Sequence, residues 1–146
     1  MLLQFPPAFG PEEASLLGDF LTKLPKKFRY AVEVRNKKLL GDKFYSLLKE
    51  KGVALAINPL MPETEQITSD FAYIRWEGDR RKVNGTLGKV EVDRTDDIKK
   101  WAAKISKFLH ETKEVFGYFS KYYSGHPPAD ARQLVEALGC GLDNSS

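Results

Sequence analysis

Two opposite charges lie two residues apart at the end of an apolar segment, 30–36, whose sequence is YAVEVRN. In an extended strand, residues two apart point to the same face, so Glu33 and Arg35 are expected to share a face. A guanidinium is well shaped to bind phosphate or carboxylate, and a partly buried carboxylate beside it can transfer a proton. The pair is therefore either part of an acid/base and anion-binding site or a structural ion pair that only neutralises charge.

Polar residues recur in this way at the ends of five apolar segments. The carboxyl ends of parallel strands meet at one edge of a sheet, where α/β proteins place their sites. We therefore predict a site with Glu33 as the acid/base group, Arg35 and Arg75 as anion ligands, and Gln4 and Asn58 as orienting amides. The candidate catalytic residues are Glu33, Glu77 and His126, and the candidate ligand-binding residues are Gln4, Arg35, Asn58, Arg75, Tyr118 and Ser120.

The elements that must position these residues alternate along the chain. Strands are predicted over 2–5, 30–34, 53–58, 71–76 and 114–119, and helices over 11–24, 41–52, 95–111 and 127–139. In the first helix, apolar residues recur at helical spacing, namely Leu16, Leu17, Phe20, Leu21 and Leu24. Alternating strands and helices predict an α/β fold with a parallel sheet. Two architectures fit: an open doubly wound sheet, or part of a (β/α)₈ barrel.

The segment 79–92 interrupts this alternation. It contains Asn84-Gly85 between polar and β-prone residues, a pattern typical of a type I′ hairpin, so a hairpin insertion is predicted there. The segment is also basic, and a run of aromatic and basic residues follows the fifth strand. These residues form an alternative, nucleic-acid-binding surface, in which cations contact phosphates and aromatic rings stack on bases. Its candidate residues are Arg80, Arg81, Lys82, Lys121 and Tyr122.

Length and composition restrict the class of protein. The chain has 146 residues, which fits one domain, and a net charge of +3, which gives nucleic-acid binding only weak support. No apolar run reaches the roughly 20 residues of a membrane span, and the first residues do not resemble a signal peptide, so we expect a cytoplasmic protein with no membrane partner. The single cysteine, Cys140, excludes an internal disulfide, and two histidines are too few for a zinc cluster. The sequence requires no cofactor, and Mg²⁺ held by carboxylates stays an open alternative.

Five blocks of the sequence together resemble the YecE-like family, catalogued as domain of unknown function 72. The blocks are LLQFPPAF, YAVEVRN, FAYIRWEGDRR, VDRTDDIKKWAAKI and EVFGYFSKYYSGHPPADARQL, and they extend from Leu2 to Leu138. The resemblance implies a TIM barrel, which usually has about 250 residues. Residues 1–138 would then form its C-terminal portion, an incomplete barrel with about five of the eight βα units, and 139–146 would be a flexible tail.

The resemblance also bears on the site, although this family has no settled activity. It matches Gln4, Glu33, Arg35, Arg75, Gly125 and His126 to polar positions of the family. Asn36 and Glu77 stand where many members have histidine, and Ser120-Lys121 stands where Asn-Asn is typical. An incomplete barrel leaves strand edges open, so the expected partners are a small anionic ligand and a second chain that supplies the missing strands. The alternatives are a nucleic-acid-binding accessory module and an inactive fragment or split half-barrel.

Overall fold

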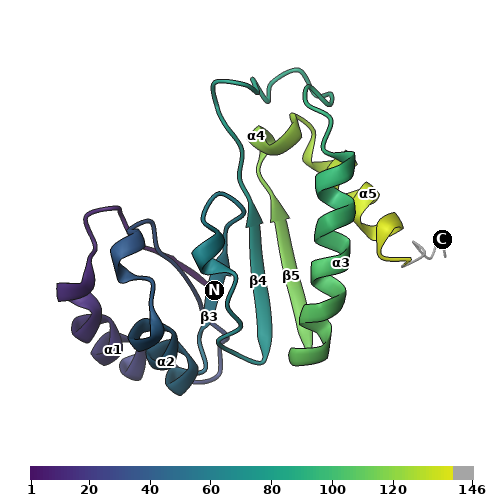
Figure 1. Ribbon diagram of the computed structural model, residues 1–146. Helices are drawn as coiled ribbons and strands as arrows, with labels where there is room; N and C mark the ends of the chain where they lie inside the picture. Colours follow the sequence, from purple (N-terminus) through teal and green to yellow (C-terminus); the bar gives the residue numbers. More distant parts are fainter. Residues whose placement is uncertain (140–146) are drawn as a thin grey trace.

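The structure is a computed structural model that describes residues 1–139; Cys140 and the rest of the predicted tail lie outside the described residues. Five parallel strands form one sheet in the order β1-β2-β3-β4-β5 (Figure 1). The strands are β1 (Leu2–Gln4), β2 (Ala31–Glu33), β3 (Ala54–Ile57), β4 (Phe71–Trp76) and β5 (Glu114–Phe119). The helices are α1 (Ala14–Lys23), α2 (Asp42–Lys51), α3 (Thr95–Glu111), α4 (Lys121–Ser124) and α5 (Pro127–Ala137), and three short 3₁₀ turns are η1 (Pro11–Glu13), η2 (Lys37–Leu39) and η3 (Pro62–Thr64).

The strand order decides between the two architectures that the sequence left open. A doubly wound sheet reverses its strand order at a switch point, whereas the strands here follow one another in space as they do in sequence. The doubly wound alternative is therefore wrong, and the parallel α/β fold is confirmed. Strand order without reversal also keeps right-handed crossovers on one face of the sheet. None of the helices within residues 1–139 is long and apolar enough to cross a membrane.

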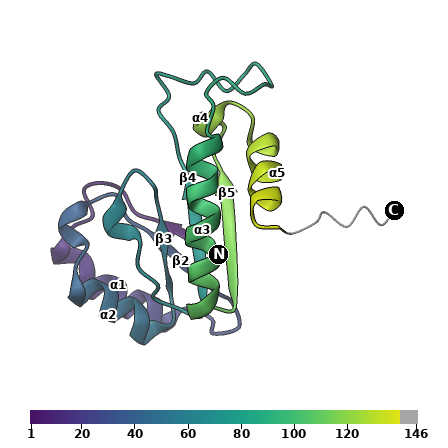
Figure 2. The ribbon, with the colours of Figure 1, turned by 45° about the vertical axis from the view of Figure 1, so that its right-hand side comes forward.

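The two faces of the sheet differ in what covers them. One face carries large apolar side chains that are paired across the strands, Val32 with Leu55 and Ile57 with Ile74. Helices α1 and α2 pack on its β1–β3 part and α3 on its β4–β5 part (Figures 1 and 2). The opposite face is clustered around Ala31, Ala54 and Phe71, and among the described residues its core consists of strand residues alone.

The sheet curves toward this second face, which we call the concave face. The guanidinium of Arg29, just before β2, pairs with Glu114 at the start of β5 and lies 5.3 and 5.0 Å from the ring centres of Phe71 and Phe116. Two strands separate β2 from β5, and in a flat sheet that would place their backbones about 14 Å apart. The contact therefore reflects a curled sheet, as in the wall of a barrel.

The predicted hairpin over 79–92 is wrong. A type I′ turn needs a positive φ at both central residues, and within residues 1–139 only glycines have a positive φ, Gly85 among them at 68°. The carboxylate of Glu91 accepts hydrogen bonds from the backbone N–H groups of Asn84 and Gly85 at 2.9 and 2.8 Å. The N–H groups of Glu91 and Val92 donate to the carbonyl of Ser124. Residues 77–94 thus form an irregular loop, the 77–94 loop, anchored on α4 above the carboxyl ends of β4 and β5 (Figure 1).

Candidate functional site

The predicted polar residues meet in an open cavity of about 650 Å³ at the carboxyl ends of the strands, which we call the strand-end cavity. Gln4 and Glu33 end β1 and β2, Asn58 follows β3, and Arg75 and Glu77 lie at the end of β4. The cavity is lined by Gln4, Glu33, Arg35, Asn58, Leu60, Met61, Arg75, Glu77 and Arg80. The sequence pattern thus located the cavity and six of the residues that line it.

A single guanidinium organises the two carboxylates of the cavity. One terminal nitrogen of Arg75 donates to Glu33 Oε2, and the other donates to Glu77 Oε1 at 2.7 Å. Gln4 Nε2 also donates to Glu33 Oε2, at 3.1 Å. Arg75 comes from β4 and Glu33 from β2, so the ion pair crosses β3, whose side chains on this face are the small Ala54 and Ala56. Small residues on β3 therefore allow the two outer strands to share one charge pair.

Burial makes this cluster costly to disturb. The side chain of Glu33 is only 5% exposed, against 24% for Arg75 and 25% for Glu77. Burial on its own lowers the pKa of Arg75, but the hydrogen bond to Glu33 and the charges of Glu33 and Glu77 outweigh it and raise the pKa. Arg75 therefore stays cationic, and both of its terminal nitrogens are occupied by carboxylates.

The guanidinium groups of two other arginines of the cavity are not hydrogen-bonded to its carboxylates. The side chain of Arg35 is 58% exposed, and its Nε lies 3.7 Å from Glu33 Oε1, which is too long for a hydrogen bond. Arg80 is exposed and extends from the 77–94 loop into the lining of the cavity, with its guanidinium 4.8 Å from the ring centre of Tyr122. The sequence assigned Arg80 to the basic segment of the alternative nucleic-acid surface, and the path of the loop that brings it to this cavity could not be predicted. Leu60 and Met61 were also missed, and their only signal was their position directly after the third strand.

Three predicted site residues do not line the cavity. Tyr118 stacks on Tyr73 on the concave face, with ring centres 5.1 Å apart. Ser120 caps the start of α4, where its Oγ accepts a hydrogen bond from the N–H of Tyr122 at 3.2 Å. His126 precedes α5, and its N–H donates to Ser124 Oγ at 3.2 Å. These contacts give Ser120 and the backbone of His126 structural roles next to the cavity.

The proposed nucleic-acid surface is only partly assembled. Arg80 and Lys121 both lie over the ring of Tyr122, at 4.8 and 5.0 Å from its centre. Arg81 instead makes two hydrogen bonds to the carboxylate of Asp79, and these bonds lower the pKa of Asp79. Lys82 is exposed on the same loop. The surface therefore has one aromatic ring, and two cations already lie against it.

A buried polar pair lies at the turn between α4 and α5. Ser124 Oγ donates to Asp130 Oδ2 at 2.6 Å, and both residues are buried. Burial raises the pKa of Asp130, and the hydrogen bond from Ser124 and the nearby side chains of His126 and Arg94 oppose part of that rise. Arg94 also donates from Nε to the carbonyl of Tyr123 at 2.8 Å. This pair fixes the turn between α4 and α5 on which the 77–94 loop is anchored, and the sequence patterns did not single out Asp130.

Comparison with known proteins places the chain in a family. A family model described as "Protein of unknown function DUF72" matches residues 1–145. The chain belongs to the DUF72 family. A crystal structure of a DUF72 protein from Enterococcus faecalis has a TM-score of 0.78, with 21% identity over 97% of this chain and 61% of that chain. One from Thermotoga maritima has a TM-score of 0.74, with 21% identity over 94% of this chain and 56% of that chain.

These comparisons confirm the resemblance seen in the sequence and extend to the fold. The DUF72 chain described here spans between 56% and 61% of the length of those two relatives. No curated protein matches it. Within residues 1–139, no group of three or more His, Cys, Asp or Glu side chains is placed to hold a metal ion.

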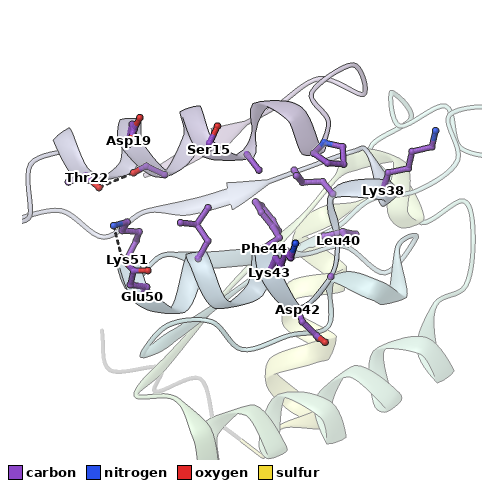
Figure 3. A pocket seen from close by; sticks show the side chains of 16 residues that line it. Ser15, Asp19, Thr22, Lys38, Leu40, Asp42, Lys43, Phe44, Glu50 and Lys51 are labelled. Carbon is purple, nitrogen blue, oxygen red and sulfur yellow. Dashed lines mark hydrogen bonds and ion pairs between the residues drawn. The ribbon is translucent and has the colours of Figure 1, made fainter.

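A groove larger than the strand-end cavity lies on the helical side of this DUF72 chain. It has a volume of about 820 Å³ and separates α1 from α2 (Figure 3). The two helices come close where α1 carries Gly18, because a Cβ atom there would lie 3.2 Å from a methyl group of Leu47. Its charged side chains include Glu50 and Lys51, which pair with each other at 2.8 Å. The groove shows no convergent polar cluster comparable to the one around Arg75.

Proposed function

We propose that this DUF72 chain acts in the cytoplasm and binds a small phosphate- or carboxylate-bearing ligand in the strand-end cavity, with Glu33 as an acid/base group. The observation that carries the proposal is that the three arginines of the cavity differ in their contacts with carboxylates. Arg75 is occupied by Glu33 and Glu77, whereas among the described residues the guanidinium groups of Arg35 and Arg80 make no hydrogen bond to a carboxylate, and the Arg35 Nε lies 3.7 Å from Glu33 Oε1. Three arginines against two glutamates give the cavity a net charge of +1, which favours anions.

The proposed roles follow from the contacts. Arg35 and Arg80 bind the anion, because a guanidinium offers two parallel N–H groups to phosphate or carboxylate. Arg75 is a positioning residue that holds Glu33 and Glu77 in place. Glu33 Oε2 already accepts two hydrogen bonds, so Oε1 is the oxygen with capacity to accept a proton from the ligand. Glu77 is the second acid/base candidate, and the amides of Gln4 and Asn58 orient the ligand.

The anion ligands can be tested by titration with inorganic phosphate and small dicarboxylates in a calorimeter. We expect Arg35→Ala and Arg80→Ala each to weaken binding on the order of tenfold. Arg81→Ala is the matched control, because it removes the same charge from the same loop, but Arg81 is paired with Asp79 and does not line the cavity. Equal losses for Arg80→Ala and Arg81→Ala, or no anion binding by the unaltered chain, would reject the proposed site.

The acid/base role needs a separate test. Glu33→Gln keeps the shape of the side chain and removes its charge, so phosphate affinity should stay the same or rise while any proton-transfer activity is lost. Gln4→Ala is expected to have a smaller effect on activity, because it removes one of the two hydrogen bonds to Glu33 Oε2. Activity that survives Glu33→Gln and falls in Glu77→Gln would move the acid/base role to Glu77.

A second candidate function, binding of single-stranded nucleic acid, is supported by the two cations over Tyr122. In that case oligonucleotide binding weakens steeply as salt rises, and the slope against log salt decreases by about one unit for each phosphate contact removed. Arg80→Ala and Lys121→Ala should each flatten the slope, and Tyr122→Ala should weaken binding at every salt concentration. No binding at low salt would eliminate this function, and a chain that binds neither anions nor oligonucleotides would fit an inactive half-barrel.

A further inference from the structure

Within residues 1–139, strand β5 is an edge of the sheet with little of the usual protection. It pairs with β4 alone, in a continuous register of six residue pairs from Phe71↔Glu114 to Trp76↔Phe119. Edge strands are normally kept from pairing by lysine, proline, a bulge or short length. The six residues of β5, EVFGYF, include neither lysine nor proline, and Glu114, Gly117 and Tyr118 are exposed. By contrast, the other edge strand, β1, has three residues and is followed by Pro6 and Pro7.

Large apolar side chains are exposed next to both edges. Tyr118 on β5 is 51% exposed, and Phe28 beside the amino end of β2 is 47% exposed. Leu16 and Phe20, which the sequence pattern placed in the apolar stripe of α1, are 66% and 45% exposed. They lie one turn apart on α1, which is the outermost helix on the β1 side of the sheet (Figure 1). Leu17 and Leu21 of the same stripe are buried, so α1 has an apolar surface wider than the one it buries.

The concave face is also incompletely filled. Aromatic side chains from β4 and β5 lean over the alanines of β2 and β3, as the cluster of Phe71 with Ala31 and Ala54 shows. A cavity of about 250 Å³ remains on this face, lined by Tyr73, Phe116 and Tyr118 among others. An apolar, curved face with open edges on both sides is the surface that further strands of the same curvature would cover.

We propose that the β5 edge, the concave face and the outer side of α1 bind a polypeptide of about three βα units, and that its strand pairs parallel to β5 to close a (β/α)₈ barrel. The occupant has the chemistry of the segment that the longer DUF72 proteins have in addition. The Enterococcus faecalis protein matches 97% of this chain but is matched over only 61% of its own length. The parallel sheet, its strand order and its curvature all continue in the direction that barrel closure requires.

A second copy of the chain is a poorer fit to the same surface. A two-fold axis relates two copies of one edge, so β5 would pair antiparallel with β5. Such a pair would leave the β1 edge and the exposed side of α1 uncovered. The two occupants therefore predict different stoichiometry and different protected residues, and one experiment can separate them.

The test uses the complete 146-residue chain, co-expressed with the segment of the Enterococcus faecalis protein that this chain does not match. We expect a 1:1 complex in native mass spectrometry and slower hydrogen exchange of the β5 amides, on the order of tenfold or more, relative to the chain alone. Amides of the central strand β3 should change little. A lone monomer whose β5 amides are already as protected as those of β4, or a self-paired dimer that excludes the segment, would overturn the proposal.

Two variants test whether the complex forms through the β5 edge. Tyr118→Lys places a charge beside the β5 edge and should weaken the complex on the order of tenfold. Leu109→Lys is the matched control, because Leu109 is similarly exposed, at 49%, but lies on α3 rather than on an edge strand, and this variant should leave the complex unchanged. If the segment is insoluble by itself, it is fused to the chain in one polypeptide. β5 amides in the fusion that still exchange as in the lone chain would reject the proposal.

Discussion

The concave face carries an ion pair at each end, and the two differ in burial more than in geometry. At the amino end, Arg29 pairs with Glu114 across β3 and β4, and the two side chains are 51% and 52% exposed. At the carboxyl end, Arg75 pairs with Glu33 across β3, and the exposed fractions are 24% and 5%. Water screens the first pair, whereas the second pair must compensate its own desolvation.

This contrast explains why we place the functional site at one end only. A nearly buried carboxylate is stable in the folded chain only if its partners stay in place, and Gln4 and Arg75 both hold Glu33. At the amino end, the Arg29 guanidinium lies over the rings of Phe71 and Phe116, and the neighbouring ion pair of Lys113 with Asp70 is exposed as well. The same type of ion pair therefore organises the strand-end cavity at one end and lies on the exposed sheet surface at the other.

The largest effect is expected from removing the buried cation. Arg75→Met leaves Glu33 buried without its charged partner, and we expect the free energy of unfolding to fall by about 3–5 kcal/mol. Urea denaturation measures this loss. Combining it with Glu33→Gln should cost much less than the sum of the two single changes, because the double variant leaves no unpaired charge. Additive losses would show that Glu33 and Arg75 are not coupled.

A smaller loss is expected where the 77–94 loop meets α4 at the carboxyl end. A Cβ atom on Gly78 would lie 1.8 Å from the carbonyl oxygen of Tyr122, so Gly78→Ala must displace backbone. We expect a destabilisation of about 1–3 kcal/mol and weaker anion binding, because Arg80 follows Gly78 by two residues. Gly41→Ala is the control, since nothing lies within 4 Å of a Cβ there. Equal thermal shifts for both variants would contradict this close approach.

The buried carboxylate of Asp130 gives a prediction with a defined sign. Burial raises its pKa on folding, so the folded chain binds this proton more tightly than the unfolded chain does. The stability contributed by this group is therefore greatest below the ordinary aspartate pKa and is lost as the pH rises through the raised pKa. We expect Asp130→Asn to gain stability relative to the unaltered chain as the pH rises from about 3 to about 7.

Urea midpoints of both proteins over that pH range measure the trend for Asp130. Asp19→Asn, at an exposed position on α1, serves as the control for removing any carboxylate. A difference between Asp130→Asn and the unaltered chain that is flat with pH would show that Asp130 has its ordinary pKa in the folded chain. A difference that moves in the opposite direction would show a lowered pKa, and either result contradicts this prediction.

The smallest effect is expected at the amino end. Arg29→Met removes an exposed pair and should lower the free energy of unfolding by about 0–1 kcal/mol. The loss should shrink further in high salt, since exposed charges are screened. A loss as large as that of Arg75→Met in the same urea assay would abolish the distinction between the two ends.

Local sequence patterns predicted much of the fold. The strands Phe71–Trp76 and Glu114–Phe119 and the helix Thr95–Glu111 have the predicted bounds, because their periodicity and their flanking turn residues agree. The Asn84-Gly85 hairpin failed because Glu91 binds both backbone N–H groups, a contact that depends on where the loop crosses α4. Leu16 and Phe20 fitted a helical stripe, but their exposure depends on what packs beside α1.

The location of the strand-end cavity could be predicted from the sequence, but the pairing of its charged side chains could not. Because residues two apart in a strand point to the same face, the sequence predicted that Glu33, Arg35 and Arg75 share one face. Because sites in these folds lie at the carboxyl ends of the strands, it also predicted that the three side chains lie close together. Both terminal nitrogens of Arg75 donate to glutamates. This pairing depends on the curvature of the sheet and on the small alanines of β3, which allow side chains from β2 and β4 to meet. The proximity of Arg80 depends on the path of the 77–94 loop, and no local pattern encodes it.

The most direct test of where the site lies is a titration of the ¹⁵N-labelled chain with inorganic phosphate, followed by NMR. We expect saturable shifts in backbone and guanidinium signals around Glu33, Arg35, Glu77 and Arg80, and unchanged signals at Arg29 and Glu114. At the phosphate concentration that half-saturates the unaltered chain, Arg35→Ala should reduce these shifts severalfold. Shifts centred on Arg29, or spread evenly over all exposed lysines and arginines, would contradict an anion site at the carboxyl ends of the strands.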